Sequence, residues 1–382
     1  MKQITYSKQK IFKDDFASVK KALKSNFLTT GPTVEIFEKK IKNYLNSKYV
    51  LSCSSGTSAL FMAFNAIDLK KNDVVVCPII NFVATTNLLS LFNANIIFVD
   101  INEKTGALDI TKVEKILKKK RIKKVKAIVN MHIGGIPNDI EKFYKLKKKY
   151  NFLLIEDSCH AFGSTYNINN KTYKIGSCNH ADISTFSFHP LKTITTCEGG
   201  VLTTNIKKFY EKSKLFRSHG INRNKDNHYS YDVKQIGLNL RLSDLNSALG
   251  ITQLQKINYI IKKRNDIAKY YNKKFSKNNN FKIIGILNKN DKSCYHLYRI
   301  QIKSKKLEID KLINHLKLNN IISQKHYIPL YEFSYYKKKY GLKSNKYPCS
   351  KEYFKKTISI PIHLDCKKKD LEKIYSVLNE KI

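Results

Sequence analysis

The 382-residue sequence predicts an α/β fold, in which a large domain with a mainly parallel mixed sheet sandwiched by helices precedes a smaller C-terminal α+β domain. Two observations predict it. Between about residues 48 and 205, short apolar runs alternate with helical segments, which is typical of a parallel sheet covered on both faces. After residue 205 the alternation stops, and long helical patterns mix with isolated strand-like runs. We therefore place the large domain, with its N-terminal segment, at 1–249 and the small domain at 250–382.

The individual elements follow from the periodicity of the apolar residues. In the large domain, strands are predicted at 49–53, 73–78, 95–101, 126–132, 152–157, 181–188 and 200–205, and helices at 57–67, 85–94 and 139–150. The stretch 243–275 predicts one long helix, or two in succession, that could bridge both domains. In the tail, strands are predicted at 295–302, 321–329 and 357–363, and helices at 308–320 and 368–382.

Bulk composition excludes several classes of protein. The hydrophobic fraction of 42% is typical of a globular protein, and no apolar stretch reaches the roughly eighteen residues of a membrane span. The N-terminal sequence lacks the apolar core of a signal peptide, so a cytoplasmic location is expected. The eight cysteines lie singly, without a CxxC pair, so they predict neither a zinc site nor a redox dithiol. We expect no metal.

The formal net charge of +41 is compatible with a nucleic-acid-binding protein. However, only six of the 71 basic residues are arginine, the residue that most often reads bases. No helix-turn-helix or RNA-binding signature is present, and the lysines are spread along helix faces. We therefore expect no nucleic-acid partner. The charge could instead help to attract an anionic substrate.

A first candidate site is SSGTSAL, at 54–60, which follows a predicted strand and opens a helix. Small residues at such a turn leave backbone N–H groups free, and the helix dipole adds partial positive charge. Gly56, Thr57 and Ser58 could therefore hold a phosphate. An ordinary helix cap by Ser or Thr is the alternative.

A second candidate is IEDSCHAFGS, at 155–164, where Asp157 ends an apolar strand. Open α/β sheets bind ligands at the carboxyl ends of their strands, so this carboxylate could pair with a protonated ring nitrogen. A helix cap or a salt bridge explains Asp157 equally well. His160 could stack on a ligand, hydrogen-bond to it, or simply belong to the turn. Phe82, after another strand, could stack on a flat ring or pack in the core.

A third candidate is FSFHPLKTITTCEGG, at 186–200, which carries Lys192 in weakly charged surroundings. A free lysine has a pKa of about 10.4 and is a poor nucleophile at neutral pH. Desolvation or a neighbouring cation lowers that pKa, and the neutral amine can then condense with an aldehyde. Ser187 offers a hydroxyl to a phosphate, and Gly199 and Gly200 permit close backbone approach. A structural salt bridge is the alternative for Lys192.

Together these stretches supply a phosphate cradle, an acid for a pyridine nitrogen, an aromatic residue for the ring face and a condensing amine. Pyridoxal 5′-phosphate (PLP) requires this set of groups. The three stretches together therefore predict a PLP-binding protein.

In combination and in order, the motifs resemble those of the DegT/DnrJ/EryC1/StrS family of PLP-dependent sugar aminotransferases. The likeness runs nearly end to end, through LTTGPTVEIFEKK, SSGTSALFMA, PIINFVATTN, IEDSCHAFGS, FSFHPLKTITTCEGGVLTTN, FRSHGI and IGLNLRLSDLNSALGITQL. The resemblance implies PLP as cofactor, the PLP-dependent transferase fold type I, and a homodimer whose subunits share each active site.

The resemblance also implies roles for individual residues. Lys192 would bind the cofactor covalently, Asp157 would pair with its pyridine nitrogen, and His160 would lie by its ring, where many members carry Gln. The cofactor-binding residues would be Gly56, Thr57, Ser58, Phe82, Asp157, His160, Ser187, Lys192 and, from the neighbouring subunit, Asn239. The substrate-binding residues would be Thr30, Gly31, Arg241, His326 and Tyr327. Close relatives could carry alanine where this chain has Gly56, and the glycine should not disturb a backbone-bound phosphate.

Within the family, FSFHPLKTITTCEGG, FRSHG and HYIPLYE most resemble members that act in pseudaminic acid biosynthesis. This implies transfer of an amino group from L-glutamate, which becomes 2-oxoglutarate, to C4 of a UDP-linked 4-keto-6-deoxy-N-acetylhexosamine, UDP-2-acetamido-2,6-dideoxy-β-L-arabino-hexos-4-ulose. The alternatives are the D-xylo 4-keto sugar of the bacillosamine or legionaminic type and another nucleotide-ketosugar. Sugar 3-dehydratases of the family replace the condensing lysine with histidine, so Lys192 disfavours that reaction. A degenerate regulatory homologue is disfavoured because every cofactor position is intact.

Overall fold

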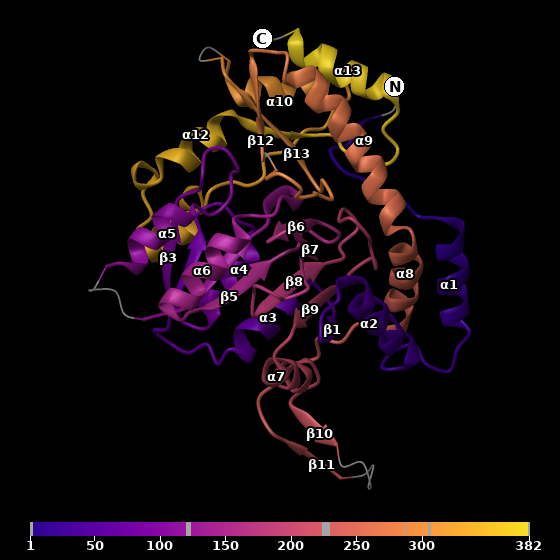
Figure 1. The fold of residues 1–382 in the computed structure, drawn as a ribbon. Coiled ribbons are helices and arrows are strands. Elements are labelled where there is room, and N and C mark those ends of the chain that lie inside the picture. Colours follow the sequence, from indigo (N-terminus) through magenta and orange to yellow (C-terminus); the bar gives the residue numbers. More distant parts are fainter. Residues whose placement is uncertain (1–2, 120–123, 224–229, 286, 305–306, 381–382) are drawn as a thin grey trace.

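The computed structural model describes residues 3–119, 124–223, 230–285, 287–304 and 307–380. At its centre is a seven-stranded sheet in the order β1-β9-β8-β5-β4-β2-β3 (Figure 1). Its strands are β1 (Tyr49–Cys53), β2 (Val74–Pro78), β3 (Asn95–Val99), β4 (Val125–Met131), β5 (Leu153–Asp157), β8 (Ile183–Ser187) and β9 (Gly200–Thr204). Neighbours pair in parallel except at β9, which is antiparallel to β1 and β8. The mainly parallel mixed sheet predicted from the sequence is confirmed.

Helices cover both faces of this sheet, as predicted. Successive side chains of a strand point to opposite faces, so Val75 and Cys77 pack in a cluster with α3 and α4, whereas Val74 and Val76 pack in another with α5 and α6. The helices of this part are α1 (Lys13–Leu23), α2 (Pro32–Leu45), α3 (Gly56–Ala66), α4 (Val83–Leu91), α5 (Ile110–Leu117), α6 (Ile140–Tyr150) and α7 (Lys207–Arg217). The sequence predictions lacked α1, α2, α5 and α7.

Two consecutive helices link the central sheet to the C-terminal part of the chain. They are α8 (Asp244–Gln255) and α9 (Ile257–Phe275), which meet at Lys256, so the alternative of two helices in succession is correct. Figure 1 shows α8 beside α1 and α2, and α9 rising from it toward the second sheet. The predicted domain boundary between residues 249 and 250 lies inside α8, and the division of the chain stays a prediction.

A second, three-stranded antiparallel sheet lies beside α9, in the order β12-β13-β14 (Figure 1). The elements of this part are β12 (Phe281–Ile284), β13 (Tyr298–Ile302), α10 (Ile309–Leu318), α11 (Ser334–Tyr340), α12 (Pro348–Lys356), β14 (Thr357–Ile360) and α13 (Lys368–Asn379). The predicted strands at 295–302 and 357–363 and both predicted tail helices are present, although residues 381–382 lie outside the described residues. The N-terminal segment also contacts this part of the chain, because Ile4 forms an isolated bridge with Ile321.

The prediction of a strand at 321–329 is wrong. This run makes isolated bridges at Ile321 and Gln324 and otherwise has no regular partner among the described residues. Its two ends bind different parts of the fold, because the Gln324 amide donates to the Ser359 carbonyl while the Leu330 amide donates to the Ile79 carbonyl. A segment that crosses between two sheets cannot pair along one strand.

Two hairpins complete the fold. One joins β6 (Thr165–Ile168) to β7 (Lys171–Lys174), and the other joins β10 (Ile221–Arg223) to β11 (Tyr231–Val233). The second hairpin projects away from the central sheet, below α7 in Figure 1. Neither hairpin was predicted from the sequence.

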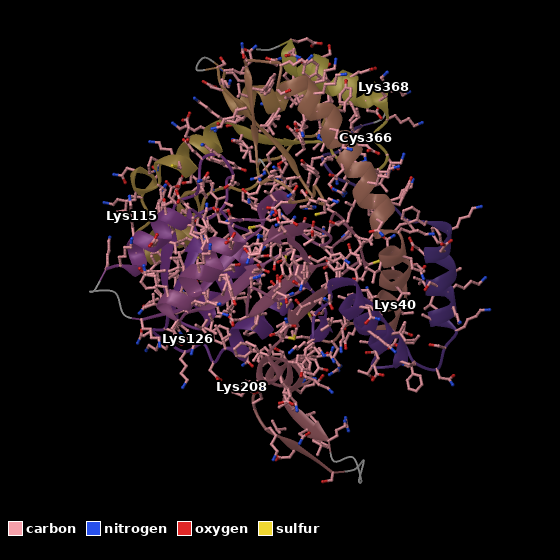
Figure 2. All side chains as sticks on the ribbon, in the orientation of Figure 1. Lys40, Lys115, Lys126, Lys208, Cys366 and Lys368 are labelled. Carbon is pink, nitrogen blue, oxygen red and sulfur yellow. The ribbon has the colours of Figure 1, made fainter. Side chains whose placement is uncertain are left out.

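Five lysines are labelled in the view of Figure 2. The lysines labelled there come from α2, α5, β4, α7 and α13, and they are Lys40, Lys115, Lys126, Lys208 and Lys368. These five lysines are therefore spread over separate elements and not gathered at one site. Within the described ranges, no helix has both the length and the apolar character needed to cross a bilayer. The same ranges contain no group of side chains that could hold a metal ion.

Candidate active site

A pocket of about 590 Å³ opens where the carboxyl ends of β4, β5 and β8 meet the N-terminus of α3. Its volume is typical of small-molecule sites. Of the residues predicted from the sequence, it is lined by Gly56, Thr57, Phe82, Asp157, His160, Ser187, Lys192, His326 and Tyr327. The structure therefore brings the three candidate stretches together at one edge of the sheet.

The N-terminus of α3 forms one wall of this pocket. Ser55 caps the helix by accepting a hydrogen bond from the Ser58 amide at 3.0 Å, while the amides of Gly56 and Thr57 have no partner within the helix. Together with the helix dipole, these free N–H groups suit a phosphate. A Cβ atom at Gly56 would lie 2.7 Å from the Cβ atom of Ser187. An alanine there would require Ser187 to shift, whereas the glycine present leaves this space clear. The expectation that glycine at this position leaves the phosphate site undisturbed stays a prediction.

Ser58 is not among the residues that line the pocket. Its hydroxyl lies 2.8 Å from the Ser54 hydroxyl and 2.9 Å from the Ser55 hydroxyl, so it takes part in the helix cap. A phosphate contact for Ser58 stays a prediction. Ser55 does line the pocket, and sequence reasoning missed it although serine is a preferred N-cap residue.

Replacing Gly200 with alanine should damage this wall, because the new Cβ atom would lie 2.2 Å from the Ser55 carbonyl oxygen and 2.8 Å from the Gly56 nitrogen. Both neighbours are backbone atoms and cannot rotate away. We expect the free energy of unfolding to fall by about 1–3 kcal/mol and PLP affinity to fall with it. Urea unfolding and cofactor titration measure the two effects. Gly341→Asn is the control, because open space surrounds Gly341 and asparagine tolerates its positive φ; equal PLP affinity in Gly200→Ala and wild type would contradict the prediction.

Asp157 lies at the end of β5 and is almost completely buried. Its Oδ1 accepts a hydrogen bond from the Cys159 amide at 3.2 Å, and its Oδ2 accepts one from the Thr85 hydroxyl at 3.5 Å. Among the described residues no basic side chain forms an ion pair with it, so the salt-bridge alternative fails. A buried carboxylate without a cation is unfavourable. The site therefore fits a ligand that brings a positive charge, such as a protonated pyridine nitrogen.

Lys192 lies after β8 and reaches into the same pocket. No carboxylate among the described residues is within ion-pair distance of its amine, so the structural salt bridge proposed as an alternative is absent there. Burial lowers the pKa of Lys192 below its usual range, although the nearby Cys159 and Asp157 act in the opposite direction. A lowered pKa leaves more of the amine neutral, which is the form that attacks an aldehyde.

Two aromatic rings complete the pocket. Phe82 caps α4 and is 50% exposed, which contradicts the core-packing alternative and leaves its ring available for stacking. His160 is buried, and its ring lies 4.2 Å from the ring of His296. Burial, followed by the positive charge of Lys192, lowers the pKa of His160 well below its usual range, so the ring is neutral. Its Nε2 lies 2.8 Å from the hydroxyl of Tyr327.

The remaining predicted residues lie elsewhere in this chain. Thr30 and Arg241 line a second hollow of about 820 Å³, whose basic residues also include Lys214, Arg217, His219, Arg223 and Lys234. Asn239 is exposed. Gly31 is buried and donates its amide to Asp244 at 2.8 Å. The cofactor role of Asn239 and the substrate roles of Thr30, Gly31 and Arg241 stay predictions.

Several pocket residues were missed by sequence reasoning. They include Tyr6, Asn81, Cys159, Glu198 and His296. Asn81 and Cys159 stand inside the motifs quoted above, so their position in those motifs was a usable signal. Tyr6 gave none, because long-range contacts bring it to the pocket, among them the hydrogen bond that its carbonyl accepts from the Ile362 amide.

Acid should destabilise the protein through two buried histidines. Burial lowers the pKa of His326 to about 3 and that of His363 to about 4, whereas both side chains titrate near 6.5 when unfolded. Below about pH 6.5 these histidines therefore become protonated in the unfolded chain but stay neutral in the folded chain. The free energy of unfolding consequently falls by up to about 1.4 kcal/mol per pH unit for each histidine. Urea unfolding at several pH values measures this slope. His363→Gln should reduce it, and equal stability at about pH 7.5 and pH 5 would contradict the prediction.

Comparisons with known proteins agree with this geometry. The model of the DegT/DnrJ/EryC1/StrS aminotransferase family matches residues 9–379. A UDP-4-amino-4,6-dideoxy-N-acetyl-beta-L-altrosamine transaminase from Campylobacter jejuni is 38% identical over 376 residues, which are 98% of this chain and 96% of the relative. Helicobacter pylori PseC, an aminotransferase involved in the biosynthesis of pseudoaminic acid, superposes with a TM-score of 0.91 at 32% identity, covering 100% of this chain and 99% of that chain. The PLP form of a putative sugar aminotransferase, Spr1654 from Streptococcus pneumoniae, shares the fold, with a TM-score of 0.89 at 23% identity over the whole of both chains.

Proposed function

We propose a substrate and an amino donor for this chain, which belongs to the DegT/DnrJ/EryC1/StrS aminotransferase family and is a PLP-dependent sugar aminotransferase. The acceptor is UDP-2-acetamido-2,6-dideoxy-β-L-arabino-hexos-4-ulose, aminated at C4 in pseudaminic acid biosynthesis. The donor is L-glutamate, which leaves as 2-oxoglutarate. The observation that carries the proposal is one pocket that holds both the Lys192 amine and a buried Asp157, which forms no ion pair with any described residue. The chain is also 38% identical over almost its whole length to a transaminase named for this kind of sugar.

The residues of the pocket divide the work of transamination. When bound, PLP supplies an aldehyde and a conjugated ring that accepts electrons from a substrate carbon. The free amides of Gly56 and Thr57 would hold its phosphate, and the face of Phe82 would cover its ring. Asp157 would keep a proton on the pyridine nitrogen, which strengthens the ring's pull on electrons. The Lys192 amine, whose pKa is lowered by burial, would remove a proton from the donor and return one to C4 of the sugar.

The configuration of the sugar is tested by assaying two substrates side by side. The purified protein, loaded with PLP and supplied with L-glutamate, should aminate the L-arabino 4-keto sugar nucleotide faster than the D-xylo 4-keto sugar nucleotide. Mass spectrometry of the product detects the added nitrogen and also distinguishes amination from dehydration. Equal or inverted preference would refute the L-arabino assignment while leaving sugar transamination intact. Turnover only with a different amino donor would refute the assignment of glutamate.

The second subunit of the proposed homodimer would cover apolar residues that this chain leaves exposed. After the β10–β11 hairpin, Ile236 is 85% exposed, and on α1 Phe16 is 70% exposed. Such side chains are typical of a surface that another chain covers. In this arrangement Asn239 of one subunit would complete the phosphate site of the other, which agrees with its position outside the pocket of its own chain.

Mixing inactive subunits tests the shared site. Homodimers of Lys192→Ala and of Asn239→Ala should both be inactive or nearly so. A mixed dimer should regain activity, because one of its two sites has both residues intact. Differently tagged chains, co-expressed and purified by both tags, provide the mixed dimer. Activity no higher than that of the parent homodimers, or a fully active Asn239→Ala homodimer, would contradict the shared site.

A further inference from the structure

A small hollow of about 10 Å³ lies between the loop that carries Lys192, helix α9 and the N-terminal segment. This volume has room for about one particle the size of a water molecule. Four basic side chains line the hollow, those of Lys8, Lys10, Lys192 and Arg264, and no Asp or Glu is among the described residues that line it. The hollow is therefore bordered by positive charge without a carboxylate.

Arg264, on α9, is the basic residue of this hollow that is buried, with 1% of its surface exposed. Its Nη1 donates hydrogen bonds to the carbonyl oxygens of Tyr295 and Ile362, both at 3.1 Å, and of His296 at 3.3 Å. Its Nε is buried and has no hydrogen-bond partner among the described residues. No carboxylate in the described ranges forms an ion pair with Arg264. Since a buried guanidinium without an anion is unfavourable, the surroundings of Arg264 favour an added negative charge.

The polar side chains of the hollow differ in whether their donors are already used. Thr193 is buried, and its hydroxyl forms no hydrogen bond with another described residue. By contrast, the Thr195 hydroxyl donates to the Phe188 carbonyl at 3.0 Å, and the Gln253 side-chain amide donates to the Lys10 carbonyl at 2.8 Å. An N–H of Arg264 and the O–H of Thr193 therefore stay available, and an anion can accept from both.

The N-terminal segment closes the hollow on one side. Its ammonium groups are already paired, because Lys8 and Lys10 form ion pairs with Asp365 at 3.0 Å and 2.9 Å. The Ser7 hydroxyl donates to the Leu191 carbonyl at 3.1 Å, which ties the segment to the loop that carries Lys192. The charge of Arg264 is therefore the buried one that these ion pairs leave without a partner.

We propose that this hollow binds one small monovalent anion, such as chloride, held by Arg264 and Thr193. A volume near that of one water molecule is too small for sulfate, phosphate or a carboxylate. A water molecule fits the volume, but it brings no charge to offset the guanidinium. The inference goes beyond the proposed function and rests on neither its cofactor nor its sugar. The bound anion would join the N-terminal segment to α9 and to the loop of Lys192, and would thereby stabilise the folded chain.

Thermal unfolding of the full PLP-loaded chain tests the anion site in solution. Sodium chloride is exchanged stepwise for sodium methanesulfonate at constant ionic strength, because the larger anion does not fit the hollow. A ligand that binds only the folded state should raise Tm by about 2 °C for each tenfold increase in chloride above its dissociation constant. Sodium bromide should act as chloride does. Equal Tm in chloride and methanesulfonate over the whole range would overturn the proposal.

Two arginine variants separate a specific site from a general effect of salt. Arg264→Met should remove the difference between the two salts. Arg299→Met is the matched control, because Arg299 is 2% exposed and donates to the Thr105 carbonyl at 2.9 Å, but does not line the hollow. It should lower Tm in both salts and keep the chloride response. A response that persists in Arg264→Met, or disappears in both variants, would overturn the proposal.

A pair of threonine variants gives a milder test that does not remove a buried charge. Thr193→Val should raise the chloride concentration at half-maximal response by about tenfold, because a hydrogen bond to a charged group is lost. Thr195→Val is its control, because the hydroxyl of Thr195 is already bonded to the Phe188 carbonyl. Its half-maximal concentration should equal that of the wild type. An unchanged value in Thr193→Val would refute the contact between Thr193 and the anion.

Crystals of the unmutated protein grown in sodium bromide locate the anion directly, so this test does not depend on a variant that folds. Bromide scatters anomalously and water does not. An anomalous peak is expected in the hollow, within about 3.5 Å of the Arg264 guanidinium. Peaks beside exposed lysines alone, or density in the hollow without an anomalous signal, would overturn the proposal. Failure of the sugar or donor assignment would leave these results unchanged, so the two proposals fail separately.

Discussion

Replacing Lys192 with alanine should lower the turnover of the 4-keto sugar nucleotide by about 10⁴-fold or more. The amine is the group that would bind the cofactor covalently, and it is also the base that would move a proton at the reacting carbons. Among the described residues, the active-site pocket is lined by two lysines, Lys192 and Lys325. Lys325 forms an ion pair with Asp310 at 2.6 Å, so Lys192 is the pocket lysine without a carboxylate partner among these residues. Steady-state kinetics measures the loss. Borohydride treatment should attach the cofactor to the wild-type chain and leave the variant unlabelled.

Lys174→Ala is the matched control for this experiment. Lys174 is also partly buried, burial likewise lowers its pKa, and its ammonium lies 3.8 Å from the centre of the Tyr44 ring, outside the pocket. If a depressed pKa alone were sufficient for function, the two substitutions would have similar effects. We expect Lys174→Ala to keep the wild-type turnover and borohydride labelling. Labelling of the Lys192→Ala chain at another lysine would refute the assignment of the covalent attachment point.

The central sheet could be predicted from the sequence because most of its strands are buried on both faces, although the edge strand β3 is only partly buried. The run that forms β2 consists of Val74 to Pro78, all buried, and such continuous apolar runs stand out from helical patterns. The segment 321–329 was also predicted as a strand, but its path is set by long-range partners in two different parts of the fold, at Ser359 and at Ile79. Helix α2 could also have been found, because its buried Phe37, Ile41 and Leu45 recur every four residues.

The candidate site was predictable where one motif supplies both the side chain and its position. Asp157 and Lys192 follow strand ends, and parallel strands bring such ends to one edge of the sheet. Contacts between distant segments were not predictable in this way. The pairing of His160 with Tyr327 depends on the path of an irregular segment, and the clash that an alanine at Gly56 would cause depends on how closely α3 approaches β8. A local sequence pattern shows neither the distance between His160 and Tyr327 nor the distance between α3 and β8.

Replacing Asp157 with asparagine should lower turnover by about 10²- to 10³-fold, while making the cofactor-free protein more stable. The amide can still accept the hydrogen bond of the Cys159 amide through its oxygen, so the local fold should persist. It cannot supply the negative charge that keeps a pyridine nitrogen protonated. Removing a buried carboxylate that has no cation should raise the free energy of unfolding of the cofactor-free chain, by about 1 kcal/mol. Kinetics with the sugar nucleotide and urea unfolding without PLP measure the two opposite effects.

Asp182→Asn distinguishes a functional carboxylate from a structural one. Asp182 is equally buried beside the same sheet, but it accepts hydrogen bonds from the Lys147 ammonium and the Leu154 amide, both at 2.7 Å. Losing its charge should therefore destabilise the chain by about 1–3 kcal/mol and leave turnover nearly unchanged. The two substitutions would thus change stability in opposite directions, and only Asp157→Asn would lose turnover. If Asp157→Asn instead kept its turnover and lost stability, its carboxylate would be part of the scaffold, and the cation that we assign to this pocket would have no partner.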